Sequence, residues 1–223
     1  MRCILLPIHP EWCAKILNGD KSIEVRRGAT LHKAINKLIK NQGKAPCLIY
    51  CTKSRKGEII ARKGEDLSKQ LLYLSPFTKS LEKYPNLISL NGKVVAEFEA
   101  SAEVIESNQF SIRFTKTLNA FELEKCSCLT QTKIADYLVD NDGSPVLGTA
   151  IHIHGLKTFD KPKELKEFYQ SFRCKKHEWK FADNNVEVDS RYKALRQPIR
   201  GGYEYTYPLT KAPQSWCYAE VAE

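Results

Sequence analysis

The stretch "ILNGDKSIEVRRG", from Ile16 to Gly28, decides the fold expected of this chain because it joins a turn to a strand of alternating character. Gly19 follows a helix-like apolar segment and suits the left-handed position just past a helix end. In the strand that follows, the isoleucine and the valine face one way while Glu24 and Arg26 face the other, because successive side chains alternate. The strand therefore shows a carboxylate and a guanidinium on one face, about 7 Å apart at the backbone.

The segments on both sides continue the alternation of strands and helices. Strands are predicted at 2–8, 45–52, 92–105, 146–159 and 213–222, and helices at 9–19, 30–43, 129–143 and 161–169. Thr30 is expected to cap the second helix. The outer face of that helix is basic, with His32, Lys33, Lys37 and Lys40. Residues 57–92 are less regular and are interpreted as an insertion, in which "DLSKQLLYL" (66–74) has a helical pattern.

These elements indicate the α+β class, with a mixed sheet that curls into a small barrel and helices outside it. We expect seven side chains of this sheet to turn inward: Ile23, Val25, Val94, Ala96, Phe98, Ile151 and Ile153. The main domain is predicted to span residues 1–172, including the insertion at 57–92. Residues 173–223 form a C-terminal extension whose last strand, at about 213–222, packs back on the barrel.

Composition restricts the kind of partner. The 223 residues are 42% hydrophobic, which is typical of a globular chain, and 35 basic against 26 acidic residues give a net charge of +9. This surplus indicates either a polyanionic partner or a basic surface without one. The first apolar run, "CILLPI", is too short for a signal or membrane segment. We therefore expect a cytoplasmic protein without membrane contact, with its eight cysteines reduced.

The segment "GDKSIEVR" fits the motif G-x-K-x-x-E-x-R, with Gly19, Lys21, Glu24 and Arg26 at the four positions. This motif resembles that of the ASCH domain, a branch of the PUA-like superfamily. Further segments are similar in order: "CLIYCTKS", "GKVVAEFEA", "TAIHIHGLKTFDKPKELKEF" and "APQSWCYAE". The last is similar to the C-terminus of bacterial and phage-encoded ASCH proteins. The resemblance covers most of the chain except 57–92 and about 173–207.

The resemblance implies a PUA-like β-barrel with a cleft beside the motif, and RNA or a nucleotide-like ligand as partner. Some small relatives are hydrolases that cleave N4-acetylcytidine with a lysine, a threonine and a glutamate. Lys21 corresponds to that lysine, and Glu24 stands at the threonine position. The third role then falls to Glu97 or Glu99. Other relatives have been described as ribonucleases, so phosphodiester cleavage is a second implied chemistry.

Binding residues follow from charge and aromatic character. Lys21 and Arg26 are candidates for contact with phosphate or a base, because Arg is a bidentate fork and Lys a mobile charge. Candidates for further nucleic-acid contacts are Lys53, Arg55 and Lys56 in "TKSRKG" and, for base stacking, Trp216. Each candidate also has a purely structural alternative. The motif's charges would form a salt bridge at the strand entry, "TKSRKG" would be a solvated hairpin tip, and Trp216 would be a core residue. If the motif's charges are exposed, their pairing adds only about 0–1 kcal/mol to stability.

Metal ligands are sparse, and no metal or other cofactor is expected. Cys174, His177 and Cys217 are the candidates for zinc, although their spacings are loose. His152 and His154 share a strand face but lack a third ligand, which favours packing. Three functions remain open: an RNA-binding module, a hydrolase in which Lys21 and Glu24 act on RNA or a modified nucleoside, and a phage-type accessory protein that binds another protein.

Overall fold

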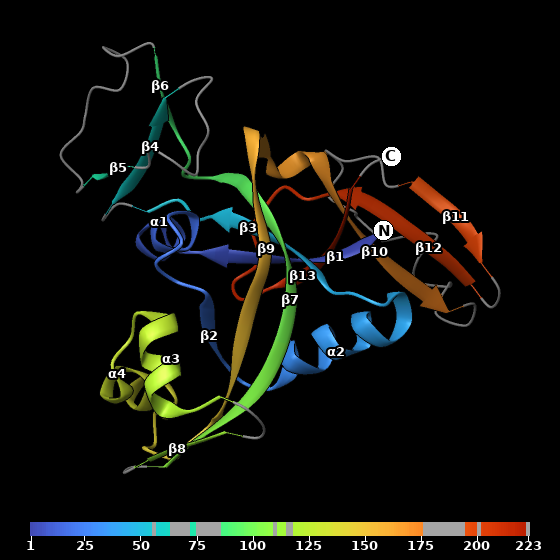
Figure 1. The fold of residues 1–223 in the computed structure, drawn as a ribbon. Coiled ribbons are helices and arrows are strands. Elements are labelled where there is room, and N and C mark those ends of the chain that lie inside the picture. Colours follow the sequence, from blue (N-terminus) through green and yellow to red (C-terminus); the bar gives the residue numbers. More distant parts are fainter. Residues whose placement is uncertain are drawn as a thin grey trace.

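The computed structural model describes residues 1–54, 57–62, 72–74, 86–108, 111–114, 118–175, 195–199 and 202–221. These residues form a ten-stranded sheet, a separate three-stranded sheet and four α-helices, so the chain is of the α+β class. Figure 1 shows the long ribbon of β7 and β9 running down the molecule, with α3 and α4 at one end and the small sheet at the other.

The strands of the main sheet are β1 (Arg2–Ile8), β2 (Ile23–Arg27), β3 (Pro46–Cys51), β7 (Lys93–Asn108), β8 (Ser111–Phe114), β9 (Leu147–Glu164), β10 (Phe168–Lys175), β11 (Leu195–Ile199), β12 (Gly202–Pro208) and β13 (Cys217–Val221). The small sheet contains β4 (Glu58–Arg62), β5 (Leu72–Leu74) and β6 (Leu87–Ser89). The helices are α1 (Pro10–Leu17), α2 (Thr30–Gln42), α3 (Ala120–Ser127) and α4 (Gln131–Tyr137).

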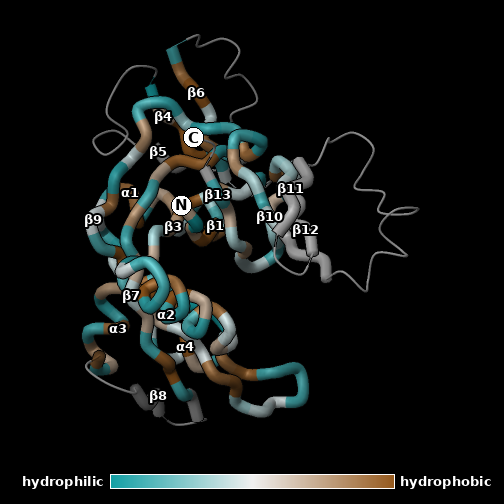
Figure 2. Tube along the Cα trace, turned by 90° about the vertical axis from the view of Figure 1, so that its right-hand side faces the viewer, coloured by the Kyte–Doolittle hydropathy of each residue, from teal (hydrophilic) through white to brown (hydrophobic). Residues whose placement is uncertain are grey.

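The main sheet is mixed, with the order β11-β12-β10-β13-β1-β3-β7-β9-β2 and β8 paired to β7. β1 and β3 are parallel, and the other pairings are antiparallel. The two parallel strands are nearly continuous apolar runs, as expected for strands buried on both faces. Figure 2 shows hydrophobic segments gathered around β1 and β3 in the middle of the molecule.

The sheet curls without closing. In the described residues, β2 and β11 are the two ends of the strand order and no pairing joins them. Yet Arg26 Nη2, on β2, donates to Pro7 O, on β1, over 2.6 Å, although β3, β7 and β9 separate these strands in the sheet. A mixed, curled sheet with flanking helices is therefore confirmed, whereas a closed barrel is not formed by the described residues.

The predicted interior divides into separate clusters. Ala96, Phe98 and Ile151 pack in one core under α1 and α2, and Ile153 lies at its margin. Ile23 and Val25 pack in another, against α3 and α4, and Val94 belongs to a third that includes Phe168. A register shift in β7 separates Val94 from Ala96, and a shift of one residue turns side chains to the opposite face. Six of the seven residues are buried and Ile153 is partly buried, so the prediction that they turn inward is confirmed, although they pack in three clusters.

Three local predictions were also wrong. The helical reading of 66–74 fails at Leu72–Leu74, which pairs with β4 as a strand, while 66–71 lie outside the described residues. The predicted helix at 161–169 is the end of β9, a 3-10 turn at Leu165–Glu167 and the start of β10, because pairing with β7 extends as far as Glu164. Thr30 is the first residue of α2, and Ala29 occupies the cap position without a side-chain bond.

α3 was not predicted; Asn119 caps it in a reciprocal arrangement with Glu122. β13 pairs antiparallel with β1, which places the end of the described chain beside its start. The described cysteines Cys3, Cys13, Cys47, Cys51, Cys126, Cys128 and Cys217 are free thiols. Among the described residues, no helix is long and apolar enough to cross a membrane.

The turn at Gly19 generates a prediction about the fold. Gly19 has φ +81°, as its position predicts, and an added Cβ would meet no heavy atom within 4 Å. Gly19→Ala should therefore lower the free energy of unfolding by about 1–2 kcal/mol through backbone strain alone. Gly19→Asn should cost less, because asparagine tolerates this conformation. Urea unfolding of the three proteins tests this, and an alanine variant as stable as the wild type would contradict the turn geometry.

Candidate functional site

The site is built where α1 turns into β2. The amides of Asp20 and Lys21 both donate to Lys15 O, over 2.9 Å and 3.1 Å, so the turn is fastened to the last turn of α1. Lys21 then projects under α3 and α4, where its Nζ donates to Ser127 O over 2.6 Å. Its exposed fraction is 2%. The sequence left the exposure of this charge open, and the tertiary structure buries it.

Glu24 lies between two cations. Its Oε2 is 3.4 Å from Lys21 Nζ, and its Oε1 is 2.8 Å from Arg26 Nε. Glu24 is only 7% exposed because it shares a sheet face with Ile151, its cross-strand partner, which belongs to the first core. The alternation predicted for this strand is correct, but both of its faces are covered. The charged face is the one that turns toward α1.

Burial changes the proton affinity of Lys21. Desolvation lowers the pKa of its ammonium below the ordinary value of 10.5, and the neighbouring Glu24 carboxylate partly opposes this. An ammonium has three N–H donors, of which Ser127 O and Glu24 account for two. A buried lysine of this kind loses its proton at a pH closer to neutral than a solvated lysine does.

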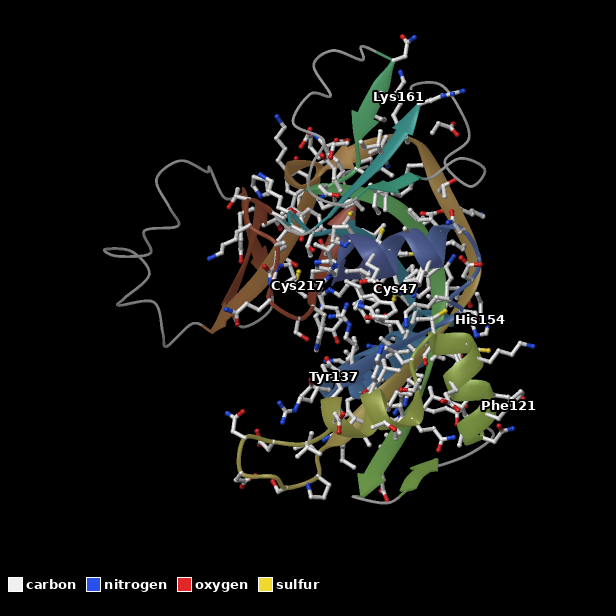
Figure 3. The ribbon with its side chains drawn as sticks, turned by 90° about the vertical axis from the view of Figure 1, so that its left-hand side faces the viewer. Cys47, Phe121, Tyr137, His154, Lys161 and Cys217 are labelled. Carbon is white, nitrogen blue, oxygen red and sulfur yellow. The ribbon has the colours of Figure 1, made fainter. Side chains whose placement is uncertain are left out.

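A cavity of about 320 Å³ opens beside these charges. It is lined by Trp12, Lys21, Glu24, Val25, Arg26, Leu129, Lys133 and Tyr137. α1 and β2 supply one wall, and α4 with the residue before its cap supplies the other. Figure 3 shows Tyr137 between α4 and the main body of the molecule. The cavity therefore combines aromatic walls with three cations and one carboxylate.

Trp12 connects the cavity to the lysines around it. Lys15 Nζ and Lys21 Nζ lie 4.7 Å and 5.2 Å from the centre of its ring, within the range of cation–π attraction. Part of the Trp12 ring is thus occupied by the protein's own cations. Tyr137 is 45% exposed and is the aromatic side chain of the cavity that faces solvent most openly.

The predicted site residues divide into two groups. Lys21, Glu24 and Arg26 are brought together in the cavity. Glu97 and Glu99 are exposed on β7 and line a different hollow of about 300 Å³, together with Met1, Lys44, Pro46, Phe98, His154, Gly155 and Lys157. The two hollows share no lining residue. The structure therefore does not bring the third carboxylate to Lys21.

The nucleic-acid candidates outside the motif are also dispersed. Lys53 is exposed after β3, where its side chain covers Gly92 at the base of the insertion. Trp216 is half-buried against the first core, edge-on to Tyr218 with ring centres 5.5 Å apart. Neither lines the cavity. Arg55 and Lys56 lie outside the described residues.

The candidate zinc ligands do not form a cluster among the described residues. Cys217 is half-buried on β13, and burial raises the pKa of its thiol to about 11. For Cys174 the backbone alone is described, in β10, and His177 lies outside the described residues. Within the described ranges, no three His, Cys, Asp or Glu side chains come together as a metal site.

Two features were not found from the sequence. One is the α4 wall of the cavity, Lys133 and Tyr137, whose four-residue spacing is common to any helix and carries no signal of a site. The other is a polar row on β7 and β9: His152 Nε2 lies 3.2 Å from Glu103 Oε1, and His154 Nε2 lies 2.9 Å from Ser101 Oγ. The alternation of "HIH" was visible, but its partners on β7 depend on sheet register.

Comparison with protein-family models found no match, and a search of curated proteins found none with significant similarity to this chain.

Because Lys21 is buried, its removal should destabilise the fold, whereas removal of an exposed lysine would have little effect. Lys21→Ala should lower the free energy of unfolding by about 3–5 kcal/mol, because removing one partner of a buried pair leaves the other charge uncompensated. Because Glu24 keeps its ion pair with Arg26 in this variant, we expect a loss of stability toward the lower end of this range. Lys133→Ala, in the exposed wall of the same cavity, should change stability by no more than about 0.5 kcal/mol. Equal melting of Lys21→Ala and wild type would show that Lys21 is solvated in solution.

The lowered pKa of Lys21 gives a pH dependence with a defined sign. Because the folded state holds this proton less tightly than the unfolded state, the unfolded state binds more protons as pH approaches 10.5, and stability rises with pH there. The raised pKa values of buried Cys3 and Tyr50 act in the opposite direction. The stability of wild type minus that of Lys21→Met removes those shared contributions. This difference, from urea unfolding between about pH 8 and 10.5, should increase, and a decrease would mean that Glu24 dominates over burial.

Proposed function

We propose that this chain is a nucleic-acid-binding protein of PUA-like, ASCH type, and that its cavity between α1, β2 and α4 holds one nucleotide unit of RNA. The observation that carries the proposal is the composition of the cavity wall. Trp12 and Tyr137 supply aromatic surface, and Lys21, Arg26 and Lys133 supply positive charge in the same enclosure. Bases stack on aromatic side chains, and phosphates pair with Lys and Arg.

The charge balance of the cavity favours an anionic ligand. Three cationic side chains and one carboxylate line it, which gives a net charge of +2 (3 − 1). Glu24 holds Lys21 and Arg26 in place, so much of their charge is already compensated. Lys133 is exposed and has no ion-pair partner among the described residues, so it is the cation most available to a phosphate.

The size of the cavity favours a small unit. A volume of about 320 Å³ lies at the lower end of the range typical of small-molecule sites. One base with its sugar and phosphate is an appropriate occupant, whereas a stacked run of bases is not. The motif Gly19, Lys21, Glu24, Arg26 supports the same proposal, because its charged members all line this cavity.

A hydrolase is the second candidate, and the buried Lys21 favours it. A lysine whose pKa is lowered by burial can accept a proton or stabilise developing negative charge, and Glu24 lies close enough to exchange a proton with it. N4-acetylcytidine and RNA phosphodiesters are the substrates to test. This candidate requires Lys21 itself, whereas binding also uses Lys133 and Tyr137.

The binding proposal predicts that the open wall of the cavity matters more than other exposed positions. Tyr137→Ala should weaken binding of single-stranded RNA by about 5–150-fold, because stacking on an aromatic side chain contributes about 1–3 kcal/mol. Lys133→Ala should weaken it and lower the salt slope by about 0.7, for one lost phosphate contact on a single strand. Fluorescence anisotropy with a labelled 12-nucleotide RNA at 50 and 200 mM salt measures both.

Phe121→Ala and Lys125→Ala are matched controls, since both positions are exposed on α3 and outside the cavity. Equal losses in controls and cavity variants would contradict the proposed cavity. An RNA-integrity gel from the same tubes, and chromatography after incubation with N4-acetylcytidine, test the hydrolase. Cleavage by wild type that Lys21→Arg abolishes while binding persists would establish it. Absence of both binding and cleavage would favour a protein partner.

A further inference from the structure

α2 carries a row of lysines along one side. Lys33, Lys37 and Lys40 are exposed and follow one another at spacings of four and three residues, which aligns them on one face of a helix. We call these three residues the lysine stripe. Seven residues of helix extend about 10 Å. A stacked nucleic-acid strand has one phosphate per about 3.4 Å of its axis, so the stripe matches the length of about three phosphates.

The charge of the stripe is not balanced locally. The sequence of α2, "TLHKAINKLIKNQ", contains no acidic residue. In the part of the chain that the structure describes, none of the three lysines forms an ion pair. Like charges three or four residues apart destabilise a helix by about 0.2–0.5 kcal/mol each. The row therefore has a cost to the fold that no ion pair among the described residues offsets.

The other side of α2 is already occupied. Leu31, Ala34, Ile35 and Leu38 are buried in the first core, and Ile39 is the single apolar side chain of this helix on the surface. In Figure 2 hydrophobic and hydrophilic residues alternate along the turns of α2. A membrane-surface helix or a helix that docks in a groove needs an apolar face for its partner. The exposed face of α2 offers charge instead, which favours a polyanion.

The stripe is connected to the cavity by a short segment. β2, which carries Glu24 and Arg26, ends at Arg27, and α2 begins at Thr30. Four residues after Arg26 span at most about 15 Å between Cα atoms. A strand with one nucleotide in the cavity can therefore pass its neighbouring phosphates over the start of α2. Cavity and stripe lie on consecutive elements of one continuous segment.

We propose that the lysine stripe of α2 binds the phosphate backbone of a single-stranded RNA on one side of the nucleotide held in the cavity. The inference rests on the proposed function, to which it adds the length of the partner. The cavity selects one nucleotide unit, and the stripe supplies sequence-independent attraction. The ligand is then a strand of several nucleotides, and a free mononucleotide lacks the phosphates that the stripe contacts.

The test compares two triple variants with the same change of net charge. The stripe variant is Lys33→Gln, Lys37→Gln and Lys40→Gln, because glutamine preserves helix propensity. The control variant is Lys125→Gln, Lys161→Gln and Lys166→Gln, at exposed positions outside α2. Figure 3 shows Lys161 at the far end of the molecule from Tyr137. Binding of a 12-nucleotide single-stranded RNA, cytidine monophosphate and phosphatidylserine vesicles is measured at 50 and 200 mM salt.

The stripe variant should bind the 12-nucleotide RNA at least tenfold more weakly at 50 mM salt, with a salt slope lower by about 2 for three lost contacts. Its affinity for cytidine monophosphate should equal that of the wild type, and the control variant should lose less than threefold on RNA. Equal losses in the two triple variants, or an unchanged RNA affinity with lost vesicle binding, would overturn the proposal. If Tyr137→Ala and Lys133→Ala leave all binding unchanged while the stripe variant still loses RNA, the cavity proposal fails and the stripe stands.

Discussion

The buried carboxylate of Glu24 is the constraint on which this structure depends. A carboxylate that is 7% exposed is costly unless cations and hydrogen bonds surround it, and Lys21 and Arg26 meet this requirement from one short segment. Each cation then bonds to a distant carbonyl, Lys21 to Ser127 O and Arg26 to Pro7 O. Through these bonds one carboxylate ties β2 to the α3 end and to β1. The curl of the sheet and the cavity wall both follow from this arrangement.

The same arrangement makes the fold and the chemistry of the cavity inseparable at Lys21 and Glu24. Loss of activity on removing either residue reports on stability as much as on function, because a buried pair is broken in both cases. The residues that separate the two lie on the other wall, where Lys133 and Tyr137 are exposed. Substitutions in α4, which leave the buried charges intact, are therefore the better test of function. The lysine stripe of α2 offers a second independent probe.

Cavity and stripe would divide recognition in the way that is common among proteins that bind nucleic acids. Phosphate contacts supply affinity that depends on salt and little on sequence, whereas an enclosed site distinguishes one base from another. Part of the net charge of +9 lies on α2, which carries cations and no acidic residue. The polar row of Ser101, Glu103, His152 and His154 lies on the other face of β9 from Ile151, away from the Glu24 side of the sheet.

The sequence by itself determined the elements that depend on local pattern: the alternation of β2, the left-handed Gly19, the apolar β1 and β3, and the amphipathic α2. These features depend on backbone preference and on the side-chain repeats of 2 residues in a strand and 3.6 in a helix, which a short stretch of sequence is enough to show. Tertiary structure alone decided that both faces of β2 are buried, because α1 covers Glu24 while α3 and α4 cover Val25. It also decided that Val94 turns away from Ala96, through a register shift that no local pattern signals. Lys133 and Tyr137 meet Lys21 across more than a hundred residues of chain, and only packing sets that distance.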